Sequence, residues 1–98
     1  MSAKQPAVYI IASGLRGTLY LGVTGSLKHR VHEHREGLVE GFTKRYGIKC
    51  LVWFELHADF TAAIKREKQL KKWNRAWKSE LIDRSNPEWR DLFGDLID

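Results

Sequence analysis

Five polar side chains in this 98-residue sequence fall at positions where a folded chain normally places apolar groups. They are Tyr9, Tyr20, Arg30, His34 and Glu67. Phenol and imidazole groups can exchange protons, a guanidinium can hold a phosphate, and a carboxylate can bind a divalent metal ion. Together these groups are the ones that an enzyme needs to hydrolyse a phosphodiester bond.

Glu67 is the most conspicuous of the five because it is the only acid between Thr61 and Ser79, a segment with seven bases. In a helix that advances about 100° per residue, Glu67 lies about 40° from Ala63, between Leu70 and Ile64, within the apolar stripe. A carboxylate at such a position needs a partner. The partner is either a structural cation such as an arginine, or a metal ion whose other ligands are water and phosphate oxygens.

The two tyrosines belong to a predicted β-hairpin. Strand alternation places Tyr9 on the opposite face from Val8 and Ile10, and Tyr20 can share the face of Tyr9. Gly22 leaves a gap on that face, where another group can approach the backbone closely. The structural alternative is that the tyrosines serve packing only.

Arg30 and His34 lie on one side of a predicted helix. His34 continues the apolar stripe formed by Leu27, Val31 and Leu38, and Arg30 lies one turn before it. The alternatives are that His34 is a hydrogen-bonded core histidine and that Arg30 forms a buried salt bridge with Glu67. We favour a site because all five groups point inward in so short a chain.

These residues are positioned by three predicted strands and several helices. Strands are expected at Ala7–Ala12, Leu19–Val23 and Cys50–Leu56, the last as a central strand buried on both faces. A first helix is expected from Ser26 to about Gly37, followed by a mobile connector at Phe42–Ile48. A second helix is expected from Thr61 into the seventies, with Asp59 as its cap. Helix then continues or restarts over Trp77–Asp83, and a last turn is expected within Glu88–Phe93. The predicted fold class is α/β, with a small three-stranded mixed or antiparallel sheet flanked by helices in the order β-β-α-β-α-α.

Composition favours a single globular domain spanning residues 1–98, with a core of about 7–93, and 43% apolar and 30% charged residues. Residues 1–79 carry a net charge of +9 and residues 80–98 a net charge of −4, which suggests a polyanionic partner, although solubility alone is the alternative.

The lone Cys50 excludes an intramolecular disulfide, and no segment is long and apolar enough for a membrane span, so we expect a cytoplasmic protein without a membrane partner. The expected phosphate contacts are Lys44, Arg45, Lys65, Lys68, Lys72 and Arg75.

Trp73 and Trp77 are four residues apart on the basic segment. We expect both in the core. The alternatives are a stacking platform for nucleic-acid bases and a dimer contact.

The same residues carry a family pattern. Val8-Tyr9-Ile10, then Tyr20-Leu21-Gly22, then Arg30, His34 and Glu67 resemble the GIY-YIG nuclease domain, and the resemblance extends from about Val8 to Leu92. The small stand-alone GIY-YIG proteins of bacteria are the most similar, through Gly41-Phe42-Thr43-Lys44, Arg66-Glu67-Lys68 and Asn86-Pro87-Glu88-Trp89. The first motif lacks its glycine and the second has Leu21 in place of isoleucine, and both changes are apolar replacements in strands.

This resemblance implies metal-dependent hydrolysis of DNA, with Mg²⁺ or Mn²⁺ held by Glu67. Tyr9 or Tyr20 would take the proton from the attacking water, Arg30 would hold the scissile phosphate, and His34 would bond a phosphate oxygen or relay a proton. Asn86 is the candidate for the late asparagine of the family, with a cap or turn as its alternative. Structure-dependent or repair-related cleavage is the finer hypothesis. A nucleic-acid-binding or partner-binding module that does not cut is the alternative function, and a protein partner would target an isolated domain of this kind.

Overall fold

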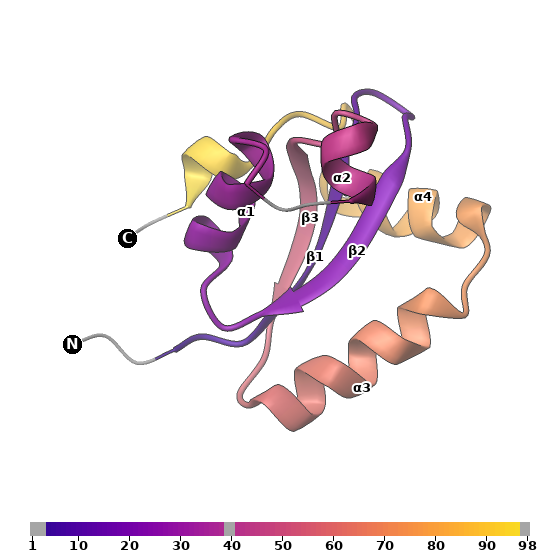
Figure 1. Ribbon diagram of the computed structural model, residues 1–98. Helices are drawn as coiled ribbons and strands as arrows, with labels where there is room; N and C mark the ends of the chain where they lie inside the picture. The colour runs from indigo at the N-terminus through magenta and orange to yellow at the C-terminus, as the bar shows by residue number, and fades with distance from the viewer. Residues whose placement is uncertain (1–3, 39–40, 97–98) are drawn as a thin grey trace.

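The computed structural model describes residues 4–38 and 41–96. Within these residues the chain forms a three-stranded antiparallel sheet with helices on both faces, an α/β fold of the kind expected (Figure 1). The elements in chain order are β1 (Ala7–Ala12), β2 (Leu19–Thr24), α1 (Leu27–Arg35), α2 (Phe42–Arg45), β3 (Cys50–Leu56), α3 (Phe60–Lys71), α4 (Arg75–Ser85) and a short 3₁₀ turn η1 (Phe93–Asp95). None of the described helices is long and apolar enough to cross a membrane.

The strand order is β2-β1-β3, so β1 is the central strand and all of its residues are buried. The prediction that Cys50–Leu56 is central was wrong. An apolar run of this kind is also compatible with an edge strand, provided that other parts of the chain cover it. Here the C-terminal segment does so, because the Leu92 amide donates to the Leu51 carbonyl at 2.7 Å and the Asp91 carboxylate accepts from the Leu51 amide at 3.2 Å.

Two apolar clusters cover the two faces of the sheet. On one face, Val8 and Ile10 of β1 pack with residues of α3 and α4, including Leu70 and Ile82. On the other face, the Tyr9 side of β1 packs with α1, Ile48 and the C-terminal turn. The alternation of β1 therefore separates a purely apolar layer from the layer that contains the tyrosines.

Helix α1 ends at Arg35, just before Gly37, the glycine predicted to mark its end, and Leu38 is 65% exposed. The expected continuation of the apolar stripe to Leu38 was wrong because a glycine ends the helix. Gly37 has φ +69°, its amide donates to the His34 carbonyl, and the Leu38 amide donates to the Glu33 carbonyl. This is the Schellman arrangement, in which a glycine in the left-handed conformation closes the last turn.

The predicted Asp59 cap of α3 is confirmed, whereas the Asn74 cap of α4 was not predicted and the last turn, expected within Glu88–Phe93, lies at Phe93–Asp95. The Asp59 carboxylate accepts from the Ala62 amide at 2.8 Å and starts α3. The Asn74 side chain accepts from the Trp77 amide at 2.8 Å and starts α4 as a separate helix. The connector Phe42–Ile48 contains the helical turn α2.

The expectation that both Trp73 and Trp77 are core residues was wrong for Trp77. Trp73 is partly buried against the α3 and α4 side of the core, whereas Trp77 is 55% exposed. Trp77 occupies the first turn of α4, which begins a new direction after Asn74, so the helical spacing of the two residues does not place them on one buried face.

Candidate active site

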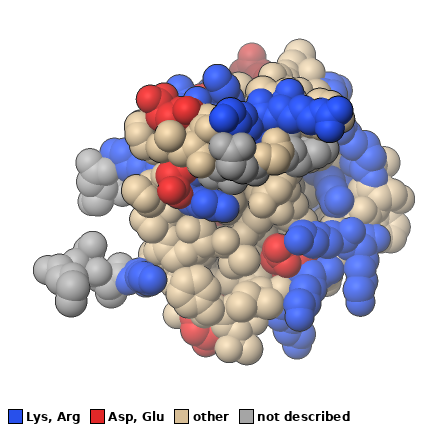
Figure 2. Space-filling model, in the orientation of Figure 1, with Lys and Arg blue, Asp and Glu red and all other residues tan. Residues whose placement is uncertain are grey.

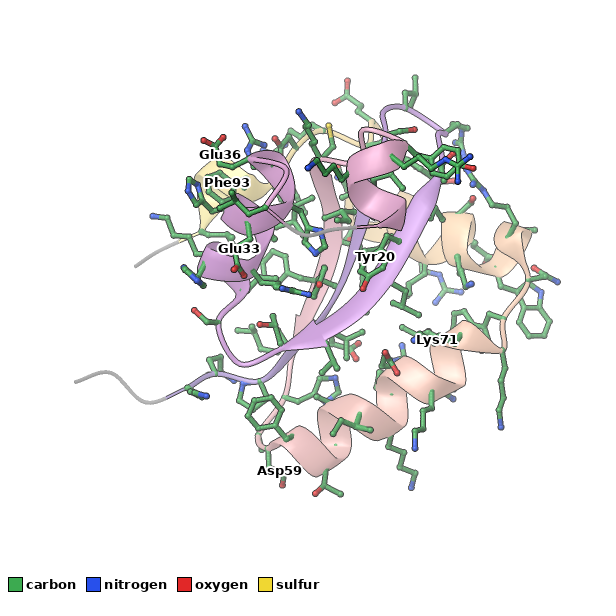
Figure 3. All side chains as sticks on the ribbon, viewed as in Figure 1. Tyr20, Glu33, Glu36, Asp59, Lys71 and Phe93 are labelled. Carbon is green, nitrogen blue, oxygen red and sulfur yellow. The ribbon has the colours of Figure 1, made fainter. Side chains whose placement is uncertain are left out.

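Three rings gather on the face of the sheet that packs against α1. The ring centroids of Tyr9 and Tyr20 are 6.4 Å apart, and that of His34 lies 5.9 Å from Tyr9 and 5.3 Å from Tyr20. Figure 3 shows Tyr20 projecting from β2 on the side of the sheet that carries α1. The tyrosines therefore share a face, as strand alternation allowed, and the inward-pointing His34 lies against the same face.

Strand register explains how the ring cluster forms. Tyr9 pairs directly with Gly22, and Tyr20 pairs with Ile11, so the two phenols are diagonal neighbours on the sheet. The gap at Gly22 is occupied by the Tyr9 ring itself. A Cβ atom at Gly22 would lie 2.5 Å from the Tyr9 hydroxyl oxygen, so the missing side chain allows the phenol to lie flat against β2.

Arg30, Tyr9 and His34 form a hydrogen-bonded chain. The hydroxyl of Tyr9 lies 3.1 Å from Nε2 of His34 in a buried environment, and Arg30 also bonds this hydroxyl. Because a guanidinium can only donate, the Tyr9 oxygen accepts from Arg30 and its own proton is left to donate to His34. This arrangement assigns His34 the neutral tautomer in which Nε2 is the acceptor.

The pKa directions agree with this polarity. Burial raises the pKa of Tyr9 to about 12, and the opposing effect of the Arg30 bond does not cancel it. Burial and the nearby charge of Arg30 lower the pKa of His34. Desolvation opposes the charge of Arg30, but its bonds to Tyr9 and Glu33 raise its pKa overall. At neutral pH the chain therefore consists of a cation, a neutral phenol and a neutral imidazole.

Glu33 also belongs to this site, although the sequence analysis did not include it. Its carboxylate lies 3.4 Å from Nη1 of Arg30 and 3.8 Å from Nε2 of His29. The spacing of three residues between Arg30 and Glu33 is a helical contact distance, so the signal was present in the sequence. Figure 3 shows Glu33 on α1.

Glu67 lies on α3, which packs against β1 and β2, and its side chain is 14% exposed. Its carboxylate pairs with Nζ of Lys71 at 3.0 Å, one turn later on the helix. Since Arg30 pairs with Glu33, the two residues are partnered separately, and the alternative of an Arg30–Glu67 salt bridge is not the arrangement seen. Figure 3 shows Lys71 near the end of α3, next to the sheet edge formed by β2.

The donor set around Glu67 can hold only certain ions. No group of three or more His, Cys, Asp or Glu side chains suitable for a metal occurs in residues 4–38 and 41–96. A zinc cage is therefore not formed by these residues, whereas Mg²⁺ is commonly held by one or two carboxylates together with water and substrate phosphates. A single, largely buried carboxylate fits an ion of this kind.

Asn86 is the predicted site residue whose contacts are entirely with backbone groups. Its amide nitrogen donates to the carbonyls of Val52 and Arg90 at 3.0 and 2.8 Å, and its side-chain oxygen accepts from the Arg90 amide at 3.1 Å. These bonds fix the C-terminal segment to β3, as expected of the cap or turn alternative. A catalytic role of Asn86 remains a prediction.

The predicted phosphate contacts are distributed over three helices. Lys44 and Arg45 are exposed on α2, and Lys65, Lys68 and Lys72 are exposed along and just after α3. Arg75 differs, because its guanidinium donates to the carbonyls of Arg16 and Gly17 in the hairpin turn at 2.9 and 2.6 Å. Figure 2 shows basic side chains above and to the right of a largely uncharged central surface.

Comparison with known proteins supports the resemblance. The family model described as the GIY-YIG catalytic domain matches residues 5–80. A UPF0213 protein of Syntrophus aciditrophicus (strain SB) is 38% identical over 82 residues, which cover 83% of this chain and 92% of that protein. No solved structure matches the chain significantly. The family model covers most of the chain and the matching residues include both tyrosines, Arg30, His34 and Glu67, so the chain belongs to the GIY-YIG family, whose members are generally nucleases.

Proposed function

We propose that this protein is a metal-dependent endonuclease that hydrolyses phosphodiester bonds in DNA. The observation that carries the proposal is the hydrogen-bonded chain from Arg30 through Tyr9 to His34, packed against the ring of Tyr20. A buried polar network is costly unless all of its members are paired. In this network one end is a permanent cation that reaches the surface, as recognition of a phosphate requires.

Arg30 is suited to hold the scissile phosphate. Its side chain is 36% exposed, so its guanidinium is accessible from solvent. Its 3.4 Å separation from the Glu33 carboxylate is longer than a good hydrogen bond, so a phosphate can replace this contact at little cost. A guanidinium in this position would also offset the negative charge that develops on the phosphate in the transition state.

We assign Tyr20 as the proton acceptor for the attacking water and Tyr9 as a positioning residue. Tyr9 is 1% exposed and its pKa of about 12 opposes loss of its proton near neutral pH. Tyr20 is only partly buried and belongs to the same ring cluster, so a water molecule can reach its hydroxyl.

Glu67 is the residue that would hold the metal ion, Mg²⁺ or Mn²⁺. When bound, such an ion would supply Lewis-acid stabilisation of the negative charge that develops on the phosphate. The ion pair with Lys71 holds the carboxylate of Glu67 in place before binding. The side chain of Lys71 is 58% exposed, so it can turn away from Glu67 without disturbing the core.

The proposal is tested by incubating the purified protein with single-stranded, nicked and branched DNA in Mg²⁺ or Mn²⁺. Arg30→Ala, Glu67→Ala and Tyr20→Phe are each expected to lower the cleavage rate by at least about 100-fold, the effect typical of losing an electrostatic or acid–base group. Lys49→Ala serves as a control because this exposed base lies outside the proposed site. Cleavage that survives both Arg30→Ala and Glu67→Ala would indicate a contaminant and refute the assignment.

A second candidate function is a nucleic-acid-binding or partner-binding module that does not cut. It is favoured by the Glu67–Lys71 ion pair, which satisfies the carboxylate without any metal. Thermal melting in EDTA separates the two functions. A structural carboxylate predicts a sharp fall in Tm for Glu67→Ala, whereas a metal ligand can be removed with little loss or with a gain in stability.

A further inference from the structure

Trp73 and Trp77 form an open pocket outside the tyrosine cluster. The pocket has a volume of about 220 Å³ and is lined by Trp73, Trp77, Glu80, Leu81 and Arg84. Trp73 follows the end of α3 and the other four lining residues belong to α4, so the pocket lies along α4 next to its junction with α3. Figure 1 shows where the two helices meet. The indole rings meet edge to face, with centroids 5.8 Å apart and planes at 86°.

Trp77 is unusual because 55% of it is exposed beside other apolar groups. Of the four tryptophans, Trp53 and Trp89 are almost completely buried, at 6% and 3% exposure. The free face of Trp77 is continuous with Leu81 and the stem of Arg84, which follow it at helical spacing on α4. An exposed flat ring in a pocket of this kind indicates a ligand that also has a flat face.

Charge identifies the class of ligand. The segment from Lys68 to Ser79, which contains both tryptophans, carries five bases and no acid, and of these bases Lys71 is paired with Glu67 and Arg75 is bonded to hairpin carbonyls. The acid of the pocket, Glu80, is paired with Arg84 at 3.2 Å. A further cation lies next to the tryptophan pair, because the guanidinium of Arg66 is 5.5 Å from the centroid of the Trp73 ring. Aromatic rings among lysines and arginines match a polyanion with aromatic groups, which is a nucleic acid with unpaired bases.

We propose that this pocket is a stacking site for one unpaired base of a single-stranded nucleic acid. The base would stack on the free face of Trp77, and the edge of Trp73 and the side chain of Leu81 would hold Trp77 in position. Lys72 and Arg84 would contact the adjoining phosphates. Size is compatible, since a cavity of roughly 150 Å³ accepts benzene. The inference rests on the proposed nuclease function and adds a binding site for a strand outside the reacting centre.

The test is the affinity for a fluorescein-labelled oligo(dT), measured by anisotropy in EDTA so that no cleavage takes place. Trp77→Ala is expected to weaken binding roughly 5- to 150-fold, the effect of losing one base–aromatic stack, and Trp77→Phe less, because a flat ring remains. The dependence of affinity on salt should be unchanged in Trp77→Ala but shallower by about 0.7 in Lys72→Gln, since the lysine contacts a phosphate and the tryptophan does not. Phe60→Ala is the matched control, because it removes a partly exposed aromatic ring at the other end of α3.

Wild-type affinity in Trp77→Ala, or an equal loss in Phe60→Ala, would overturn the inference. Conversion of a dimer into a monomer by Trp77→Ala would also overturn it, because the pocket would then be a contact between two copies of the chain. Failure of the nuclease proposal can be distinguished from failure of the stacking site. If the wild-type protein cuts no DNA in Mg²⁺ or Mn²⁺ but binds oligo(dT) through Trp77, the stacking site stands and the endonuclease activity does not.

Discussion

Replacement of Gly22 by alanine is expected to destabilise the protein through Tyr9. The added methyl group would lie 2.5 Å from the Tyr9 hydroxyl oxygen and 2.6 Å from Cζ of the ring, distances at which atoms must move apart. The Tyr9 ring cannot move freely because it is 1% exposed and bonded to His34. Overpacking of this kind costs about 1–3 kcal/mol, and weakening of the Tyr9–His34 bond costs about 0.5–1.5 kcal/mol more.

One effect opposes this loss. Replacement of a glycine by alanine stabilises by about 0.4–1 kcal/mol, through the smaller conformational entropy of the unfolded chain. The expected net loss is therefore about 2 kcal/mol, which in a domain of this size lowers Tm by roughly 8–16 °C. Urea unfolding monitored by circular dichroism, together with thermal melting, measures both quantities.

Two further variants make the Gly22 experiment decisive. Gly94→Ala is the matched control, because a Cβ at Gly94 has no atom within 4 Å and its effect should stay within about 0.5 kcal/mol. Combining Gly22→Ala with Tyr9→Ala removes the clashing ring, so the two losses should be strongly non-additive. If Gly22→Ala melts like the wild type, or if its loss adds to that of Tyr9→Ala, the explanation that Gly22 makes room for Tyr9 is refuted.

Three other predictions concern protonation and hydrogen bonding. The ¹³Cζ resonance of Tyr9, assigned by its absence from the Tyr9→Phe spectrum, should titrate with a midpoint of about 12. Because the pKa is raised in the folded state, the contribution of Tyr9 to stability is complete below about pH 10 and lost as pH rises through 12. A midpoint near 10 would contradict burial of the hydroxyl. Because burial and the Arg30 charge lower the folded-state pKa of His34, its contribution to stability is present above about pH 6.5 and lost as pH falls further. Urea unfolding from pH 7.5 to 5 should therefore show a steeper decline for the wild type than for His34→Gln, and equal slopes would count against a buried neutral imidazole. Asn86→Ala should lower the free energy of unfolding by at least about 1–3 kcal/mol, because the buried Val52 carbonyl loses its donor, and wild-type stability in urea would rule out this structural role.

Local patterns predicted the parts of the site that depend on a single helix or strand. Helical spacing was enough to place Arg30 beside His34, whereas alternation along β1 and β2 allowed Tyr9 and Tyr20 to share a face only for one register of the two strands. The direct pairing of Tyr9 with Gly22 could not be predicted in this way, because it depends on the register between two strands. The sequence indicated a gap at Gly22 but not that Tyr9 fills it.

The errors arose where long-range packing decides between equivalent local patterns. Ala7–Ala12 and Cys50–Leu56 are both apolar runs, so their composition does not show which of them is central. Cys50–Leu56 can lie at the edge of the sheet because the C-terminal segment covers it. Trp73 and Trp77 have the spacing of a buried pair in a continuous helix. The Asn74 cap divides that segment into two helices and leaves Trp77 exposed, and a cap residue in the middle of a basic segment is a weak signal without the structure.

The pairing of Arg30 and Glu67 with different neighbours bears directly on the choice between a structural and a chemical role. A buried Arg30–Glu67 salt bridge would have given each charge a strong partner, and removal of either one would then leave a costly unpaired ion. Instead, Arg30 pairs with the partly exposed Glu33 at 3.4 Å, and Glu67 pairs with the flexible, exposed Lys71. Both partners can be displaced from solvent at small cost. Arg30 on α1 and Glu67 on α3 belong to helices that cover opposite faces of the sheet, and each charge is held by a replaceable neighbour. The guanidinium is therefore available to a phosphate, and the carboxylate to a metal ion.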